Sequence, residues 1–203
     1  MIYSIYLNII VKVFILGVYI LTGSIGSGKS EAQILFEKFN VSCFCADKIV
    51  RGLYNNSEVI LGMQNILPLC VKNGVINIEL LRETIFHNEK KMFEVEEFIQ
   101  PKVFKTFEKI VNSNQNKNII LILPTIKNNS FKKKYKVIYI AASQENRVKR
   151  LSARKNYNIH LIKKIISYQD SIDIYKKNND FFLDNNGSVQ NLENSIKKLV
   201  KLL

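Results

Sequence analysis

The chain is poor in the residues that build zinc and disulfide sites. Its 203 residues include only two histidines and three cysteines, Cys43, Cys45 and Cys70. No two cysteines form a C-x-x-C pair, so the ligand spacing typical of a structural zinc site is absent. Free thiols of this kind fit a reducing compartment, and we therefore expect a cytoplasmic protein.

Acidic residues are also scarce. The chain has 17 aspartates and glutamates against 30 lysines and arginines, which gives a formal net charge of +13. Such an excess favours anionic partners, which include nucleotides, nucleic acids and membrane surfaces. It also arises where lysines simply cover a solvated face, so charge alone leaves both interpretations open. The apolar content of 47% is sufficient for a substantial core and excludes a disordered chain.

One long apolar run stands at the N-terminus, in "MIYSIYLNIIVKVFILGVYIL". It is long enough to mimic a membrane span or a signal peptide. Lys12 interrupts the run, no basic segment precedes it and no small-residue cleavage site follows it. We interpret residues 17–22 as a buried strand and residues 1–16 as an apolar extension, and we expect no membrane partner. A membrane anchor is the alternative for this extension.

Strand-like and helix-like segments alternate along the rest of the chain. Apolar runs predict strands at 17–23, 41–46, 118–124, 136–142 and 180–187, and amphipathic patterns predict helices at 29–39, 47–54, 143–155, 158–177 and 188–203. This alternation predicts an α/β fold with a doubly wound parallel sheet. The mostly helical region of about 57–113 is too long for a crossover and is interpreted as an inserted subdomain, in which Pro101 should break or kink a helix.

The segment "GSIGSGKS", residues 23–30, fits the phosphate-binding pattern G-x-x-x-x-G-K-[ST]. Its glycines let successive backbone N–H groups face an anion, and the helix that follows adds its positive end. Lys29 can reach the β- and γ-phosphates, and the Ser30 hydroxyl can bind Mg²⁺. The predicted cofactors are ATP and Mg²⁺, and the predicted binding residues of the loop are Gly23, Ser24, Ile25, Gly26, Ser27, Gly28, Lys29 and Ser30.

Other sequence features narrow the class of nucleotide enzyme. The guanine-reading pattern N-K-x-D of GTPases is absent, and the match to their switch pattern D-x-x-G, Asp184 to Gly187, lies near the C-terminus, far along the chain from the glycine-rich segment. The strand at 118–124 ends in Pro124-Thr125, so the acidic residue that an ATPase motor carries there is missing as well. Together with the small size of the chain, these absences favour a small kinase.

Two groups of charged residues are candidates for the chemistry. Asp47 follows the second strand, where strand ends border the ligand crevice, so its carboxylate can take the proton of a substrate hydroxyl. The same position also suits a helix N-cap. Arg147, Arg150 and Arg154 share one helix face, which can cover phosphates or can simply be a solvated basic surface.

Several motifs together resemble the dephospho-CoA kinase family over about residues 17–203. They are "LTGSIGSGKS" (21–30), "FEKFNVSCFCADKIVR" (36–51), "FIQPKV" (98–103), "RVKRLSAR" (147–154), Gln169 and "LDNNGS" (183–188). The resemblance implies a phosphotransferase that moves the γ-phosphoryl group of ATP to the ribose 3′-hydroxyl of dephospho-CoA, giving CoA and ADP. It also implies a nucleotide-binding core, a helical substrate-binding insertion at about 57–113 and a helical lid at about 144–170.

The resemblance also implies roles for individual residues. Lys29 would be catalytic and, with Ser30, would hold ATP and Mg²⁺. Asp47 would be the catalytic base, Arg51 would contact the acceptor, and Arg150 and Arg154 would be lid residues over the phosphates.

The chain departs from the family pattern mainly on the acceptor side. Cys45 replaces an aspartate, Gln100 replaces a histidine and Ser24 replaces a glycine. The segment "PTIKN", 124–128, lacks the family's glutamate, and "GVINI", 74–78, lacks its arginine. These departures keep two alternatives open: a kinase for another nucleoside or small hydroxyl acceptor, and a degenerate basic protein that binds nucleic acid. The chain has no nucleic-acid-binding motif, so we expect no nucleic-acid partner, and the sequence does not specify an oligomeric state.

Overall fold

A computed structural model describes residues 17–114, 117–124, 134–153 and 159–203. The apolar extension 1–16, the predicted lid residue Arg154 and most of the "PTIKN" segment lie outside these ranges. Within the described residues, no helix combines the length and the apolar character that a membrane span requires.

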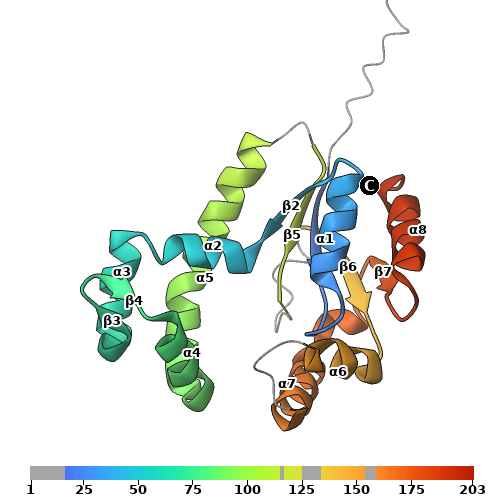
Figure 1. The fold of residues 1–203 in the computed structure, drawn as a ribbon. Helices are drawn as coiled ribbons and strands as arrows, with labels where there is room; N and C mark the ends of the chain where they lie inside the picture. The colour runs from blue at the N-terminus through green and yellow to red at the C-terminus, as the bar shows by residue number, and fades with distance from the viewer. Residues whose placement is uncertain (1–16, 115–116, 125–133, 154–158) are drawn as a thin grey trace, which may run out of the picture.

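The centre of the molecule is a five-stranded sheet with the strand order β2-β5-β1-β6-β7 (Figure 1). Its strands are β1 (Val18–Thr22), β2 (Ser42–Cys45), β5 (Ile119–Ile122), β6 (Lys136–Ala141) and β7 (Phe181–Asp184). Every neighbouring pair is parallel. The predicted doubly wound parallel sheet is therefore confirmed. Because all strands point the same way, their carboxyl ends lie along a single edge of the sheet.

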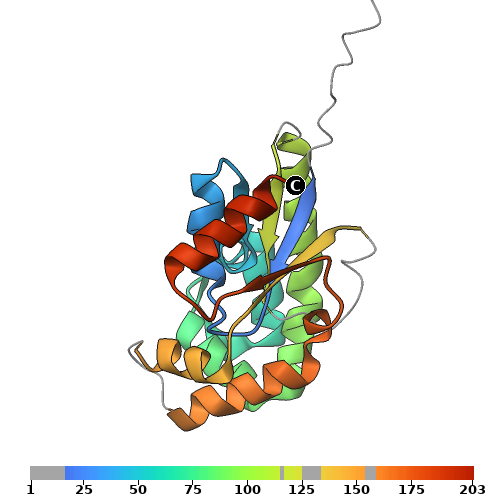
Figure 2. The same cartoon turned by 90° about the vertical axis from the view of Figure 1, so that its right-hand side faces the viewer.

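Helices cover both faces of the sheet (Figures 1 and 2). Helices α1 (Lys29–Lys38) and α8 (Val189–Val200) pack together on one face, where Phe36 and Ile196 meet Leu21 of β1. On the other face, Ile20 joins a second cluster that includes Phe107 of α5 (Glu89–Ser113). Alternate residues of β1 thus point into opposite cores, as the two-residue period of a strand requires.

The chain between β2 and β5 is mostly helical. It contains α2 (Ala46–Leu53), α3 (Ser57–Ile66), the short 3₁₀ helix η1 (Pro68–Cys70), the hairpin β3 (Val71–Lys72) and β4 (Val75–Ile76), α4 (Ile78–His87) and α5. Asn56, Asn77 and Asn88 cap the starts of α3, α4 and α5, because each side-chain oxygen accepts a backbone N–H from the first turn. Helix α5 continues through Pro101, so the predicted break does not occur.

The segment after β6 returns two helices to the carboxyl edge of the sheet. These are α6 (Gln144–Ser152) and α7 (Ile159–Ile172), followed by the short 3₁₀ helix η2 (Ile174–Lys176). The side chains of Leu151, Ile162 and Ile166 form a small buried cluster between α6 and α7, against which Ile25 of the glycine-rich segment packs. The two helices are thereby placed directly against that segment. Ser188 caps α8, because its side-chain oxygen accepts the backbone N–H of Asn191.

Candidate functional site

The glycine-rich segment 23–28 forms a tight loop between β1 and α1. Gly23, Gly26 and Gly28 have φ angles of +153°, +78° and +103°, which side-chain-bearing residues rarely adopt. The space beside these glycines also leaves no room for a side chain. A Cβ atom at Gly23 would lie 2.2 Å from the backbone oxygen of Ile140, and one at Gly28 would lie 2.0 Å from Asn185 Nδ2. The loop therefore needs glycine for both conformation and close packing.

Side-chain donors hold the carbonyl groups of this loop. Lys29 Nζ donates to the carbonyl oxygen of Gly23 at 2.5 Å. Arg150 Nη1 donates to the carbonyl oxygen of Gly26 at 3.2 Å, and Asn185 Nδ2 donates to that of Ser27 at 2.8 Å. In a trans peptide the N–H points opposite to the C=O, so anchoring the carbonyls aims the neighbouring N–H groups the other way. Successive N–H groups that face one side can form an anion-binding concavity, whereas those of Ile25 and Ser27 donate within the protein, to Gln169 Oε1 and to the Ser24 carbonyl oxygen.

The start of α1 adds to this anion site. Its N-cap is Gly28, which offers no side-chain cap, so the first N–H groups of the helix face the loop without a capping side chain. Ser30, in the first turn, is exposed, and its hydroxyl makes no hydrogen bond to any residue in the described ranges. Mg²⁺ is usually held by one or two protein oxygens together with substrate phosphates, so the Ser30 hydroxyl is suited to that ion.

Asp47 lies on the same edge of the sheet as the loop. It is the second residue of α2 and is exposed. The N-cap of α2 is Cys45, so the expectation that Asp47 is an N-cap is wrong. Cys45 and Leu21 both pair with Ile122, which places the ends of β2 and β1 two strand spacings apart, about 10 Å. Arg51 is exposed one helical turn further along α2, on the same side as Asp47.

The basic helix face predicted from sequence divides into residues with different environments. Arg147 is only 5% exposed, and both of its terminal nitrogens donate to Asp170, at 2.8 and 2.6 Å. It is therefore not part of a solvated surface. Arg150 lies against the loop, since its Nη1 donates to the Gly26 carbonyl oxygen. Its Nη2 donates to the backbone oxygen of Asn185 at 2.7 Å. Its predicted role over the phosphates stays a prediction.

Two residues at the loop were not singled out from the sequence. Asn185 lies within the motif "LDNNGS" and Asp170 directly follows Gln169, so both were adjacent to recognised signals. Partial burial acts to raise the pKa of Asp170, but hydrogen bonds from Arg147 and Ser24 outweigh it and hold that pKa below its usual value. Asp170 is therefore an ionised partner for both groups near neutral pH.

The acceptor-side departures are spread over several elements, and the segment 74–78 covers β4 and the start of α4. Cys45 ends β2 and is half-buried, whereas Gln100 is exposed on α5. Helix α2, which carries Asp47, packs against α5. The surface around Asp47 is thus shared by the sheet edge and the inserted helices.

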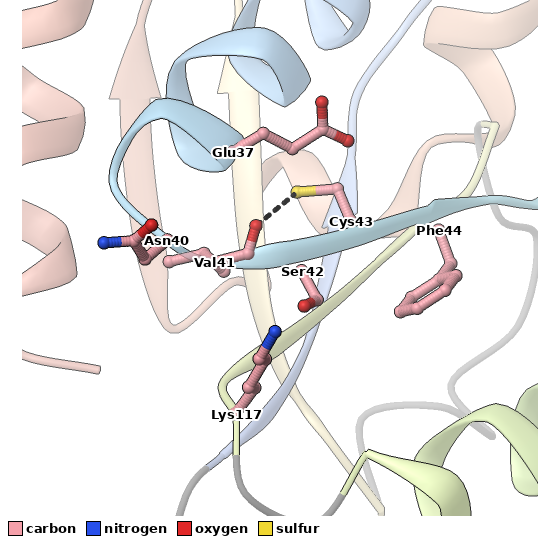
Figure 3. A pocket seen from close by; sticks show the side chains of 7 residues that line it. All are labelled: Glu37, Asn40, Val41, Ser42, Cys43, Phe44 and Lys117. Carbon is pink, nitrogen blue, oxygen red and sulfur yellow. Dashed lines mark hydrogen bonds between the residues drawn. The ribbon is translucent and has the colours of Figure 1, made fainter.

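A pocket of about 490 Å³ lies at the opposite end of the sheet (Figure 3). Its lining residues precede or begin strands β2 and β5: Glu37, Asn40, Val41, Ser42, Cys43, Phe44 and Lys117. Cys43 Sγ donates to the Val41 carbonyl oxygen at 3.8 Å. Burial, assisted by the nearby charge of Glu37, raises the pKa of Cys43 to about 12. Its thiol is therefore protonated near neutral pH and is a poor nucleophile, and the pocket is remote from the phosphate loop.

A parallel five-stranded sheet with this loop at the carboxyl end of its central strand defines the P-loop kinase class of proteins. A solved structure of dephospho-CoA kinase from Campylobacter jejuni has the same fold, with a TM-score of 0.66, 23% identity, and coverage of 91% of this chain and 95% of that one.

The sequence comparisons identify the family. The model of the family described as Dephospho-CoA kinase matches residues 16–191, and the chain belongs to that family. A dephospho-CoA kinase of Fusobacterium nucleatum is 26% identical over 90% of this chain and 96% of its own length. The corresponding protein of Gamma-proteobacterium EBAC31A08 is 30% identical over 88% of this chain and 93% of its own. The family resemblance expected from the motifs is confirmed, and the chain is an ATP-dependent kinase.

Proposed function

We propose that this chain transfers the γ-phosphoryl group of ATP to the ribose 3′-hydroxyl of dephospho-CoA, with Asp47 as the catalytic base. The observation that carries the proposal is the placement of an exposed carboxylate at the same sheet edge as the phosphate loop. Asp47 is carried by α2, which packs against α5, so the inserted helices offer a surface beside it for a large acceptor.

The nucleotide half of the proposal uses residues 23–30. Inward N–H groups of the loop and the Lys29 ammonium group neutralise the β- and γ-phosphates. The Ser27 hydroxyl is 1% exposed and has no hydrogen-bond partner among the described residues, and a phosphate oxygen would satisfy it. Ser30 Oγ would be a ligand of Mg²⁺, which when bound neutralises charge that develops on the phosphate oxygens.

The acceptor half uses α2. Asp47 accepts the proton of the acceptor hydroxyl while that oxygen forms a bond to the γ-phosphorus. The bond between the γ-phosphorus and the bridging oxygen breaks, and ADP leaves. Arg51 contacts an anionic group of the acceptor, because its guanidinium can pair two oxygens at once. Arg150 and Arg154 act at the phosphates from the lid at about 144–170.

The insertion at about 57–113 is proposed to be the acceptor-binding domain. Two observations support this. The insertion follows α2, the helix that carries Asp47, and α2 packs on α5 of the insertion. A cytoplasmic location is supported by the cysteines, since Cys43, Cys45 and Cys70 are all free thiols.

A coupled ADP-release assay with dephospho-CoA tests the proposal. Removing the base by Asp47→Asn should lower kcat by about 10²- to 10⁴-fold while leaving the KM for ATP within twofold. Lys29→Ala should instead raise the KM for ATP as well as lowering kcat. The control is Glu37→Gln, because Glu37 is an exposed acid of α1 that lies at the opposite end of the sheet, against the pocket of Figure 3. Equal losses in Asp47→Asn and Glu37→Gln would show that Asp47 has no special role.

An acceptor panel tests the substrate. Dephospho-CoA should give a kcat/KM at least tenfold above that of adenosine, other nucleosides and small alcohols. Faster phosphorylation of another acceptor would indicate that the departures at Cys45 and Gln100 change the acceptor specificity.

The role of Ser30 in binding magnesium has a separate test. Ser30→Ala should raise the Mg²⁺ concentration needed for the half-maximal rate without a comparable change in the KM for dephospho-CoA.

A further inference from the structure

A buried polar cluster joins the phosphate loop to the two helices that follow β6. Its members are Ser24 of the loop, Arg147 of α6 and Asp170 of α7, which we call the Ser24–Arg147–Asp170 cluster. Ser24 Oγ donates to Asp170 Oδ1 at 2.8 Å, and Arg147 donates to both carboxylate oxygens of Asp170. Ser24 and Arg147 are only 3% and 5% exposed.

The neighbouring contacts act on the same part of the loop. Gln169, adjacent to Asp170, accepts the backbone N–H of Ile25 through Oε1 at 2.6 Å. Ser24 Oγ also lies 3.5 Å from Asp173 Oδ2, which accepts the Tyr139 hydroxyl at 2.8 Å. The last turns of α7 therefore hold the first two residues after Gly23.

The loop is also in close backbone contact with α6. A Cβ atom at Gly26 would lie 3.1 Å from the Cα, Cβ and backbone oxygen of Arg147. Because Gly26 has no side chain, the backbone of Arg147 can lie this close to the loop, and a Cβ at position 26 would push it away by a few tenths of an ångström. The cluster thus ties the loop to α6 and α7, and Gly26 leaves room for the close approach of α6.

We propose that Ser24, Arg147 and Asp170 are positioning residues that fix the first turn of the phosphate loop to α6 and α7. The loop then keeps its shape before the nucleotide arrives, so that its N–H groups other than those of Ile25 and Ser27 can face the phosphates. This inference rests on the proposed function, because it concerns the same nucleotide site. Asp170 is the central member, since it contacts both of the others.

The chemistry of the three side chains supports the assignment. A planar guanidinium paired with both carboxylate oxygens fixes the orientation of Asp170 as well as its position. The carboxylate then presents one oxygen to the Ser24 hydroxyl in a charge-assisted hydrogen bond. A buried charge left without its partner is costly, so the cluster has one favoured arrangement.

Binding measurements without an acceptor test the inference. The probe is the ATP analogue AMP-PNP with excess MgCl₂, titrated by calorimetry into the full-length protein. Ser24→Ala removes one hydroxyl and leaves no buried charge unpaired, so the variant should fold. Its Kd for AMP-PNP should rise at least fivefold. Arg147→Gln releases Asp170, which is partly exposed to solvent, and should weaken binding in the same direction.

The matched control is Ser171→Ala. Ser171 is an exposed serine of α7 whose hydroxyl donates within its own helix, to the Tyr168 carbonyl oxygen at 2.7 Å. Its Kd should stay within twofold of the wild-type value. Because Ser24 and Arg147 act through the same carboxylate, the double variant should weaken binding by less than the product of the single effects.

Steady-state kinetics separates positioning from loss of stability. In folded Ser24→Ala, the KM for ATP should rise while the KM for dephospho-CoA stays within twofold. Wild-type affinity for AMP-PNP in folded Ser24→Ala and Arg147→Gln would overturn the inference. Wild-type protein that binds AMP-PNP but does not phosphorylate dephospho-CoA would instead count against the proposed function, and the comparison of Kd values would still decide the inference. Absence of AMP-PNP binding to the wild type would overturn both.

Discussion

Substitution of Gly23 by alanine should damage both stability and activity, for a reason visible in the backbone. The new Cβ would lie 2.2 Å from the Ile140 carbonyl oxygen and 3.0 Å from Ser27 Oγ. Ordinary contact begins at 3.4 Å, so the Gly23 and Ile140 backbones would have to separate by about 1.2 Å. Both backbones are constrained, because Gly23 directly follows β1 and Ile140 belongs to the adjoining strand β6.

The magnitude follows from two costs. Overpacking of a closed site costs about 1–3 kcal/mol. Alanine at the Gly23 φ angle of +153° adds strain of about 1–3 kcal/mol. The free energy of unfolding should therefore fall by about 2–6 kcal/mol, a large share of the roughly 5–15 kcal/mol of a typical domain. In the molecules that remain folded, a loop displaced by about 1 Å should lose on the order of 10²-fold in kcat/KM for ATP.

Two other glycines provide matched controls. Gly74 has a φ of +72° but open space around its Cβ position, so Gly74→Ala should cost only the backbone strain, about 1–2 kcal/mol. Gly52 has open space within helix α2, so Gly52→Ala should stabilise the protein by about 0.5–1 kcal/mol. Urea denaturation and the ADP-release assay measure these effects. Equal destabilisation by Gly23→Ala and Gly74→Ala, with kcat/KM retained, would refute the reasoning.

Three further changes test other parts of the structure. Pro101→Ala should raise the free energy of unfolding by about 1–3 kcal/mol, because Pro101 lies inside α5, where proline removes a helix hydrogen bond. The control Glu97→Ala, at an exposed position of the same helix, should change the free energy of unfolding by less than about 0.5 kcal/mol. A loss of stability in Pro101→Ala would contradict this prediction. Cys43, with its pKa raised to about 12, should react far more slowly with iodoacetamide at pH 8 in the folded protein than in urea, as peptide mass spectrometry can measure, and equal rates would contradict its burial. The pKa of Asp170 is lowered in the folded state, so its stabilising contribution should be complete above the ordinary value of 3.8 and be lost as pH falls below it. The stability difference between wild type and Asp170→Asn should therefore be constant from pH 7 to 5 and shrink below pH 4, and growth of that difference in acid would show that the sign is wrong.

Much of the site was predictable because it is local in sequence. The residues of the phosphate loop are consecutive, and their spacing reflects a turn that must be tight, rich in glycine and followed by a helix. The strand and helix periodicities were likewise local, and they led to the parallel sheet now observed. The motif order from residue 21 to 188 was sufficient to suggest the family that the comparisons identify.

What failed or was missed depends on partners distant in the chain. The position of Asp47 also suited the N-cap of α2, but the N-cap lies two residues earlier, at Cys45, because the helix already begins at Ala46. Pro101 was expected to break or kink a helix, yet Val103 and Phe107 are buried on the core side of α5 and the helix continues through Pro101. Tertiary packing outweighed the local preference in the second case.

The sequence by itself determined the phosphate loop, the alternation of strands and helices and the kinase family, since each is written in neighbouring residues. Only the tertiary structure decided what Arg147, Ser24 and Asp170 do. Arg147 and Asp170 are 23 residues apart and Ser24 is 146 residues from Asp170, yet they meet in one cluster. An arginine on an amphipathic helix has the same sequence pattern whether it faces water or a carboxylate of another helix, and only the packing of α6 and α7 on the loop distinguishes the two.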